Sequence, residues 1–156
     1  MELAMQVKIY SKSAMLARLK TGPLGSTAVI SFYNSPVTAF SKPIDYTGQA
    51  DRFLQIDLPD LDEHGLAEYG FTAETFFSQA EEVAAFIHNA HKDGLGFACQ
   101  CQFGSSRSAA CAAAILAFFE HRGDEICKNE RYMPNLLIYR KLLSALEKYG
   151  AAEALV

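Results

Sequence analysis

A cysteine and an arginine separated by five residues, Cys101 and Arg107, are the side chains of this 156-residue sequence with the clearest capacity for chemistry. The intervening residues include a glycine and two serines, which are small enough for the backbone to curl and turn its amides toward one centre. The apolar run after Arg107 predicts a helix, whose N-terminal amides and dipole would add positive charge. The pattern predicts a cradle for a phosphate-sized dianion, formed by Gln102, Phe103, Gly104, Ser105 and Ser106.

The same positive field would act on the Cys101 thiol. Converging N–H donors at a helix N-terminus can lower the pKa of a cysteine from about 8.5 to between about 3.5 and 7.5, which makes it a thiolate at neutral pH. A thiolate in this position can attack phosphorus, while the planar guanidinium of Arg107 holds two of the phosphoryl oxygens. We expect no metal and no cofactor, because the amides and the guanidinium supply the positive charge.

The oxygen that leaves phosphorus needs a proton, which calls for a carboxylic acid close to the cradle. Residues 59–71 form an acidic loop after a predicted strand, and this loop contains Asp60 and Asp62. Loops at the carboxyl ends of neighbouring parallel strands lie near one another. Either aspartate could therefore deliver the proton.

The elements that must position these residues follow from hydrophobic periodicity, capping residues and turn residues. Strands are predicted over residues 5–10, 27–33, 53–58 and 96–101. Helices are predicted over 12–19, from Thr72 until Gly94 ends the segment, over 107–121 and 124–129, and from Pro134 onward. Residues 34–52 read as an irregular loop.

This order predicts an α/β fold in which a central, mostly parallel sheet carries helices on both faces. Residues 1–156 are expected to form one domain, because 156 residues with 50% hydrophobic content suffice for one core and the sequence shows no linker. In such folds the ligand lies beyond the carboxyl ends of the strands. Cys101 is placed at that edge, where a central strand leads into a helix.

Composition narrows the expected partners and location. The net charge of −4 argues against a general affinity for nucleic acid or an anionic membrane surface. The N-terminus has no secretory pattern, and the apolar run over 109–119 is too short to span a bilayer. We therefore expect a cytoplasmic protein whose four cysteines are reduced.

The segment "QCQFGSSRS", residues 100–108, resembles the H-C-x5-R-S/T signature of the cysteine-dependent protein tyrosine phosphatase superfamily, in particular its compact dual-specificity-like branch. "FLQIDLPD" (53–60) is similar to the strand that leads into the general-acid loop of this family, and "NERYMPNLLIYRKLL" (129–143) to the segment that opens its last helix. The resemblance implies a phosphomonoester hydrolase acting through a cysteinyl-phosphate intermediate on phosphotyrosine or dual-specificity protein substrates, or on a small phosphoester.

The resemblance also implies a role for each matching residue. Cys101 would be the nucleophile, Arg107 the phosphate clamp, and Asp60 the general acid. Ser108 would correspond to the hydroxyl residue that hydrogen-bonds the cysteine sulfur and assists turnover of the intermediate. Gln100 stands where the family has a histidine, which leaves open a catalytically weak module that only binds phosphorylated partners.

Other interpretations are weaker. A rhodanese-like sulfurtransferase also uses a cysteine in an amide loop, but its arginine typically lies one residue closer. Cys99 could form a protective disulfide with Cys101, although a buried core position is the simpler interpretation. Zinc binding lacks the usual paired spacing, and three helix histidines, His88, His91 and His121, are expected at the surface. Aromatic residues near loop ends could frame a substrate mouth or anchor the packing: Phe40, Tyr46, Tyr69 and Phe71.

Overall fold

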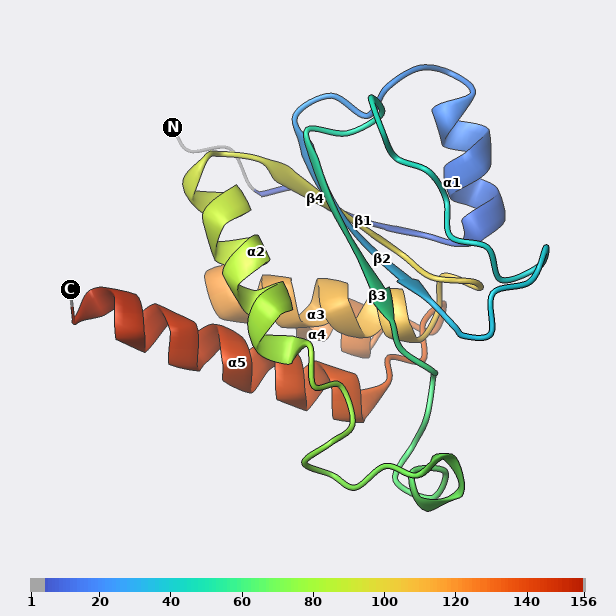
Figure 1. Cartoon of the computed structure of the whole chain (residues 1–156). Helices are drawn as coiled ribbons and strands as arrows, with labels where there is room; N and C mark the ends of the chain where they lie inside the picture. The colour runs from blue at the N-terminus through green and yellow to red at the C-terminus, as the bar shows by residue number, and fades with distance from the viewer. Residues whose placement is uncertain (1–4, 156) are drawn as a thin grey trace.

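The computed structural model describes residues 5–155, and its centre is a sheet of parallel strands (Figure 1). The strands are β1 (Val7–Tyr10), β2 (Thr27–Tyr33), β3 (Arg52–Asp57) and β4 (Gly96–Gln100), in the order β1-β4-β2-β3. β4 lies between β1 and β2, and Ile30 of β2 is in register with Cys99 of β4. The predicted parallel sheet is confirmed, and the strand that precedes Cys101 is a central one.

Helices cover both faces of this sheet, as the sequence predicts. They are α1 (Lys12–Leu19), α2 (Ala80–Lys92), α3 (Arg107–Glu120), α4 (Asp124–Cys127) and α5 (Leu136–Ala154), with a short 3₁₀ turn, η1 (Ala67–Tyr69). Figure 1 shows α2, α3 and α5 on one face and α1 on the other. Successive side chains of β2 point to opposite faces of the sheet. Ile30 packs in the core beneath α2, α3 and α5, whereas Val29 packs in the cluster that contains Met15 of α1.

Capping side chains set two helix starts next to the functional edge. The Ala14 amide donates to the Ser11 hydroxyl at 3.1 Å, so α1 begins at Lys12 as predicted. The Ile138 amide donates to the Asn135 side chain at 3.1 Å, so α5 begins at Leu136, two residues after the predicted Pro134. Both caps place a polar residue close to the Cys101 loop.

The helix predicted from Thr72 begins only at Ala80, which corrects that boundary. Phe77 has a φ of 56°, in the left-handed region that interrupts a right-handed helix. Phe76 and Phe77 are nevertheless both buried. The left-handed residue at Phe77 ends any helix that would run from Thr72 into α2. Residues 72–79 instead form turns that direct both rings inward.

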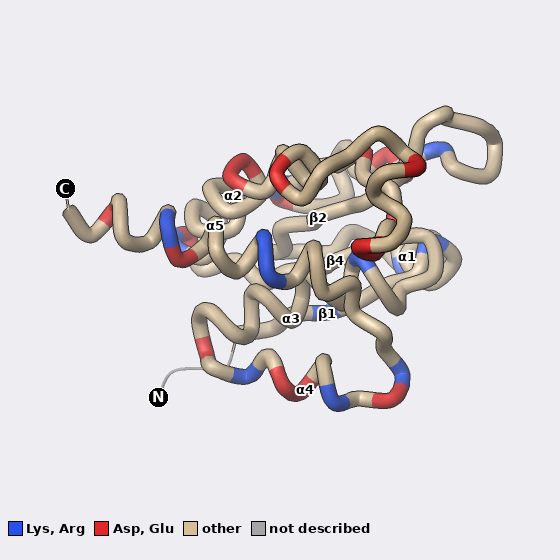
Figure 2. Tube along the Cα trace, turned by 90° about the horizontal axis from the view of Figure 1, so that it is seen from below, with Lys and Arg blue, Asp and Glu red and all other residues tan. Residues whose placement is uncertain are grey.

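Helix α3 runs through the middle of the molecule, between the sheet and α5 (Figure 1). Its run of small residues is fully buried, and small side chains let neighbouring elements approach closely. Figure 2 shows basic and acidic residues interspersed along the trace, with no continuous basic stripe over the described residues. Among residues 5–155, no helix is both long and apolar enough to cross a membrane.

Candidate active site

Cys101 directly follows β4, at the carboxyl edge of the sheet, and is buried. Its amide donates to the carbonyl of Tyr10 at 3.2 Å, and the amide of Lys12 donates to the carbonyl of Gln102 at 3.1 Å. The loop that contains Cys101 is therefore joined by its backbone to the end of β1 and the start of α1. Helix α3 begins at Arg107, so the predicted strand, loop and helix are all present.

Gly104 is required by the path of this loop. Its φ is 70°, and a Cβ built there would lie 2.6 Å from the Ser11 nitrogen and 2.9 Å from the Tyr10 carbonyl carbon. Both neighbours are backbone atoms that cannot rotate away. The left-handed conformation and the lack of space both call for glycine. The loop can pack this closely against the end of β1 only with glycine at this position.

The Cys101 thiol lies among groups that favour its ionised form. Burial alone would raise the pKa of this thiol, but the hydroxyl and amide of Ser108, the amide of Gly104 and the charge of Arg107 together lower it below its usual value. The sulfur lies 3.0 Å from the Ser108 hydroxyl. The surroundings of this thiol therefore favour the thiolate over the neutral form.

Arg107 is buried, with 6% of its surface exposed, and its guanidinium is only partly satisfied by protein. Nη1 donates to the carbonyl of Leu58 at 2.8 Å and also to the side chain of Asn34. Nε is buried and has no hydrogen-bond partner. A buried N–H without a partner is rare in proteins and costs about 1–3 kcal/mol. This N–H is therefore free to donate to an acceptor that is not part of the protein.

The two candidate acids occupy different places. One carboxylate oxygen of Asp60 accepts from the Ser106 hydroxyl and from the Asn135 side-chain amide, both at 2.8 Å. Asp62 instead accepts from the amides of His64 and Gly65, at 3.0 and 2.9 Å, and so stabilises a turn of its own loop. Asp60 is therefore in contact with the Cys101 loop, whereas the bonds of Asp62 are made within the acidic loop.

Gln100 is buried, and both polar atoms of its side chain are hydrogen-bonded. Its side-chain oxygen accepts from the Ser31 hydroxyl at 2.5 Å and from the Tyr46 hydroxyl at 2.8 Å. Its side-chain nitrogen donates to the carbonyl of Cys101 at 3.0 Å. Gln100 thus joins β2 and the loop after it to the residue that carries the thiol.

Sequence reasoning missed several of these neighbours. Asn34 follows β2 and reaches Arg107, and Asn135 caps α5 while contacting Asp60. Asn34 could have been found by its position at the carboxyl end of a predicted strand, and Asn135 lies inside the segment that carried the family resemblance. No local pattern indicates that Tyr46, in the middle of a loop, meets Gln100.

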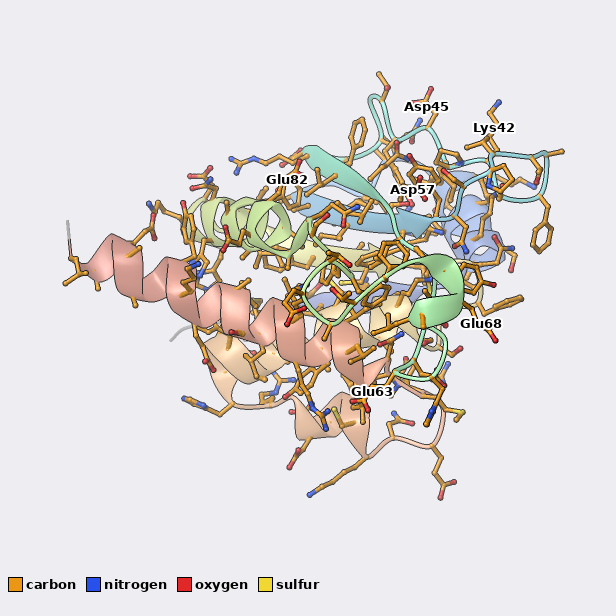
Figure 3. The ribbon with its side chains drawn as sticks, turned by 60° about the horizontal axis from the view of Figure 1, so that its bottom comes forward. Lys42, Asp45, Asp57, Glu63, Glu68 and Glu82 are labelled. Carbon is orange, nitrogen blue, oxygen red and sulfur yellow. The ribbon has the colours of Figure 1, made fainter. Side chains whose placement is uncertain are left out.

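Two cavities border the Cys101 loop on opposite sides. One, of about 360 Å³, lies toward the loop after β2 and is lined by residues that include Phe40, Phe103 and Arg107. The other, of about 820 Å³, lies toward the acidic loop and is lined by residues that include Asp60 and Ser105. In Figure 3, Lys42 and Asp45 mark the first of these loops, and Glu63 and Glu68 mark the second. A further cavity of about 540 Å³, near Gln6 and Leu95, contains none of the predicted site residues.

The predictions for Cys99, for the helix histidines and for the aromatic residues near loop ends have different outcomes. Cys99 is buried beside Cys111, and its pKa is raised chiefly by that neighbour and by burial, which confirms the core assignment. His88 corrects the surface expectation, because it is buried, hydrogen-bonds the carbonyl of Leu146 at 3.0 Å and packs on Tyr149. Among the aromatic residues, Tyr46 is buried as a packing anchor, whereas 67% of Phe40 is exposed.

A scan of protein-family models found no match, and a search of curated proteins found none either. Solved structures do match over most of the chain. DUSP15 superposes with a TM-score of 0.61 at 18% identity, covering 99% of this chain and 94% of its own. Human DUSP28 gives 0.55 at 16%, covering 96% of each chain, and PTPMT1 in complex with PI(5)P gives 0.54 at 16%, covering 95% and 94%. The chain has the fold of compact dual-specificity-like cysteine phosphatases.

Proposed function

We propose that this chain, which has the dual-specificity phosphatase fold, is a metal-independent phosphomonoester hydrolase acting through a cysteinyl-phosphate intermediate on Cys101. The observation that carries the proposal is the buried, unpartnered Nε of Arg107 beside a thiol whose pKa is lowered. A bound phosphoryl group would supply the missing acceptor, and its charge would be balanced by the guanidinium and the loop amides. The same groups are suited to stabilise the charge on the transferring phosphoryl oxygens.

In the first step the Cys101 thiolate attacks phosphorus and the phosphorus–oxygen bond to the leaving group breaks. The leaving oxygen takes a proton from Asp60, which is held near the loop by Ser106 and Asn135. The products of this step are a free alcohol or phenol and a phosphate covalently bound to sulfur.

In the second step water attacks the phosphorus of the intermediate, and the Asp60 carboxylate takes a proton from that water. The sulfur–phosphorus bond breaks, and the electron pair returns to sulfur as a thiolate. The Ser108 hydroxyl, 3.0 Å from this sulfur, can donate to the departing thiolate. Inorganic phosphate then leaves, and the carboxyl group is again protonated.

The proposed substrates are phosphotyrosine or dual-specificity protein substrates. The cavity of about 360 Å³ beside Arg107 has two exposed aromatic walls, with 67% of Phe40 and 77% of Phe103 exposed. Exposed apolar rings beside an anion site suit an aryl phosphate, because its ring can cover them while the phosphate reaches the cradle. PTPMT1, crystallised with PI(5)P, has the same fold, so lipid phosphates belong in a substrate panel. A reactive thiol calls for a reducing compartment such as the cytoplasm.

The proposal is tested by hydrolysis of para-nitrophenyl phosphate in the presence of a metal chelator. We expect turnover by the wild type, none by Cys101→Ser, and a loss of about 10²–10³ in kcat/KM for Arg107→Lys, which keeps the charge but loses the planar fork. The exposed Arg131→Lys, which lines neither of the cavities beside the Cys101 loop, serves as the matched control. If the wild type shows no chelator-resistant turnover yet binds phosphopeptides, the chain is a binding module instead.

The acid is tested with phenyl phosphate, whose poor leaving group depends strongly on protonation. Asp60→Asn is expected to lower kcat by about 10²–10⁴ and to remove the decline of activity at high pH. Asp62→Asn keeps an oxygen that can accept the two turn amides, so it is expected to leave kcat unchanged. The reverse pattern would transfer the role of the acid to Asp62.

A further inference from the structure

The buried group around Gln100 has no part in the chemistry described so far. Gln100, Ser31 and Tyr46 come from β4, β2 and the loop after β2, and all three are buried. Together they bury one amide and two hydroxyl groups beneath the Cys101 loop, and every one of these groups is hydrogen-bonded. Burying a polar group costs free energy unless the group is hydrogen-bonded. The folded chain must therefore hold these three side chains in the positions that keep their hydrogen bonds.

The orientation of the Gln100 amide follows from its neighbours. The Cys101 carbonyl can only accept a hydrogen bond, so the amide nitrogen must face it and the amide oxygen must face the other way. Two hydroxyl groups meet that oxygen, and both must donate. Burial raises the pKa of the Tyr46 phenol, so its donor proton is retained across the physiological range.

Both polar groups of the Cys101 backbone, its amide and its carbonyl, are therefore hydrogen-bonded. Its amide donates to Tyr10 of β1, and its carbonyl accepts from Gln100. These two bonds fix the peptide planes on either side of the residue, and therefore the direction in which its side chain leaves the backbone. Tyr46 and Ser31 keep the Gln100 amide turned toward that carbonyl.

We propose that Tyr46 and Ser31 act through Gln100 as positioning residues for Cys101, an inference that rests on the proposed function. The loop after β2 thereby has a part in aligning the nucleophile, although Tyr46 itself does not line the cavity of about 360 Å³ proposed for the substrate. Gln100 performs this role as a neutral amide that does not titrate, in the position where the resembling family has a histidine. The charged and polar groups that face the thiol itself are Arg107, the hydroxyl and amide of Ser108, the amide of Gly104 and the neighbouring thiol of Cys99.

The test compares Tyr46→Phe, Gln100→Met and the double variant, which keep side-chain volume nearly unchanged. With phenyl phosphate, Tyr46→Phe is expected to lower kcat about three- to tenfold with KM unchanged, and Gln100→Met about 100-fold. If Tyr46 acts through Gln100, then Tyr46→Phe causes no further loss in the Gln100→Met background. Tyr69→Phe, at an exposed tyrosine, is the matched control.

Gln100→His tests for rescue, because a neutral imidazole can donate to the Cys101 carbonyl and accept from a hydroxyl. We expect it to restore most of the kcat lost in Gln100→Met and to add a new titration between about pH 5 and 8. Melting temperatures of all variants separate loss of folding from loss of positioning. Equal losses from Tyr46→Phe in both backgrounds, or lower melting temperatures with unchanged kcat, would overturn the inference.

A second measurement does not depend on turnover. The rate at which iodoacetamide alkylates Cys101, followed in a Cys127→Ser background that removes the exposed thiol, reports the position and ionisation of the nucleophile. Slower alkylation in Tyr46→Phe and Gln100→Met supports the inference even if the wild type hydrolyses nothing, in which case only the proposed function fails. Unchanged alkylation in Gln100→Met would reject the positioning role.

Discussion

At the scale of single residues, the chemistry of Cys101 depends on a competition between burial and hydrogen bonding. Burial favours the neutral thiol, whereas the Ser108 hydroxyl, the loop amides and the Arg107 charge favour the thiolate, and the second group prevails. Cys127 shows the contrast, because it is exposed yet its pKa is raised by partial burial and by Asp124. The exposed Cys127 therefore has a raised thiol pKa, whereas the buried Cys101 has a lowered one.

This contrast predicts how alkylation by iodoacetamide varies with pH. In a Cys127→Ser background, the half-point for Cys101 is expected below the ordinary cysteine value of about 8.5, since its pKa is lowered. Ser108→Ala removes a donor to the thiolate, so the pKa rises and alkylation at pH 7 slows about tenfold. Above both pKa values the two rates are expected to converge.

The control for this measurement is Ser105→Ala, which removes a hydroxyl from the same loop that does not contribute to the Cys101 pKa. It is expected to leave the profile unchanged. A Ser108→Ala profile that matches the wild type would show that the hydroxyl does not stabilise the thiolate. Mass spectrometry of the labelled peptides identifies the modified cysteine.

At the scale of elements, the loop between β4 and α3 is built to be rigid and close-packed. Its residues are joined to β1 and α1 by backbone hydrogen bonds, and Gly104 faces the Ser11 and Tyr10 backbone at a distance that excludes a side chain. Asp60 reaches the far side of the same loop through Ser106. The loop is therefore supported from both sides before any ligand arrives.

Gly104→Ala is expected to disrupt this support. The alanine would meet both a left-handed φ, which costs about 1–2 kcal/mol, and a contact of 2.6 Å with backbone. Gly25→Ala is the matched control, because Gly25 also has a positive φ of 79° but open space around it. We expect both variants to lose stability to denaturant, and only Gly104→Ala to lose at least tenfold in affinity for tungstate. Equal tungstate affinity in the two variants would contradict the close packing of the loop.

At the scale of the whole molecule, the parallel sheet brings the residues of the candidate site together at one edge. The end of each strand contributes a contact: Tyr10 as the last residue of β1, Asn34 after β2, Leu58 after β3 and Cys101 after β4. Strands that all run in one direction bring their carboxyl ends to one edge, so residues about 90 positions apart in sequence can share one ligand. Helix α5 adds Asn135 from the same side.

A ligand that binds only the folded chain must stabilise it as a whole. Tungstate at about 100 times its Kd is expected to add about 2.7 kcal/mol to the free energy of unfolding, which corresponds to a rise of about 5–10 °C in Tm. The same rise is expected in Cys101→Ser, which retains the cradle, and a much smaller one in Arg107→Lys. Differential scanning fluorimetry measures the shift, and equal shifts in wild type and Arg107→Lys would place the anion elsewhere.

The sequence by itself determined what depends on neighbours along the chain. The bounds of α1 and β2 and the start of α3 follow from spacing, periodicity and capping, and the structure confirms them. These features arise from interactions within a few residues, where one residue type constrains the next. The predicted start of α2 was wrong, because Phe77 has a left-handed φ that interrupts the helix and that the hydrophobic periodicity does not indicate.

Only the tertiary structure decided which distant residues meet. It brought Asp60 rather than Asp62 to the Cys101 loop, placed His88 in the core, and joined Tyr46 to Gln100 across 54 positions. Such contacts depend on how strands pair and how loops return over the sheet, and no local pattern encodes them. Along the sequence, Gln100 is only a departure from the histidine of the resembling family, whereas in three dimensions its side chain hydrogen-bonds Ser31, Tyr46 and the carbonyl of Cys101.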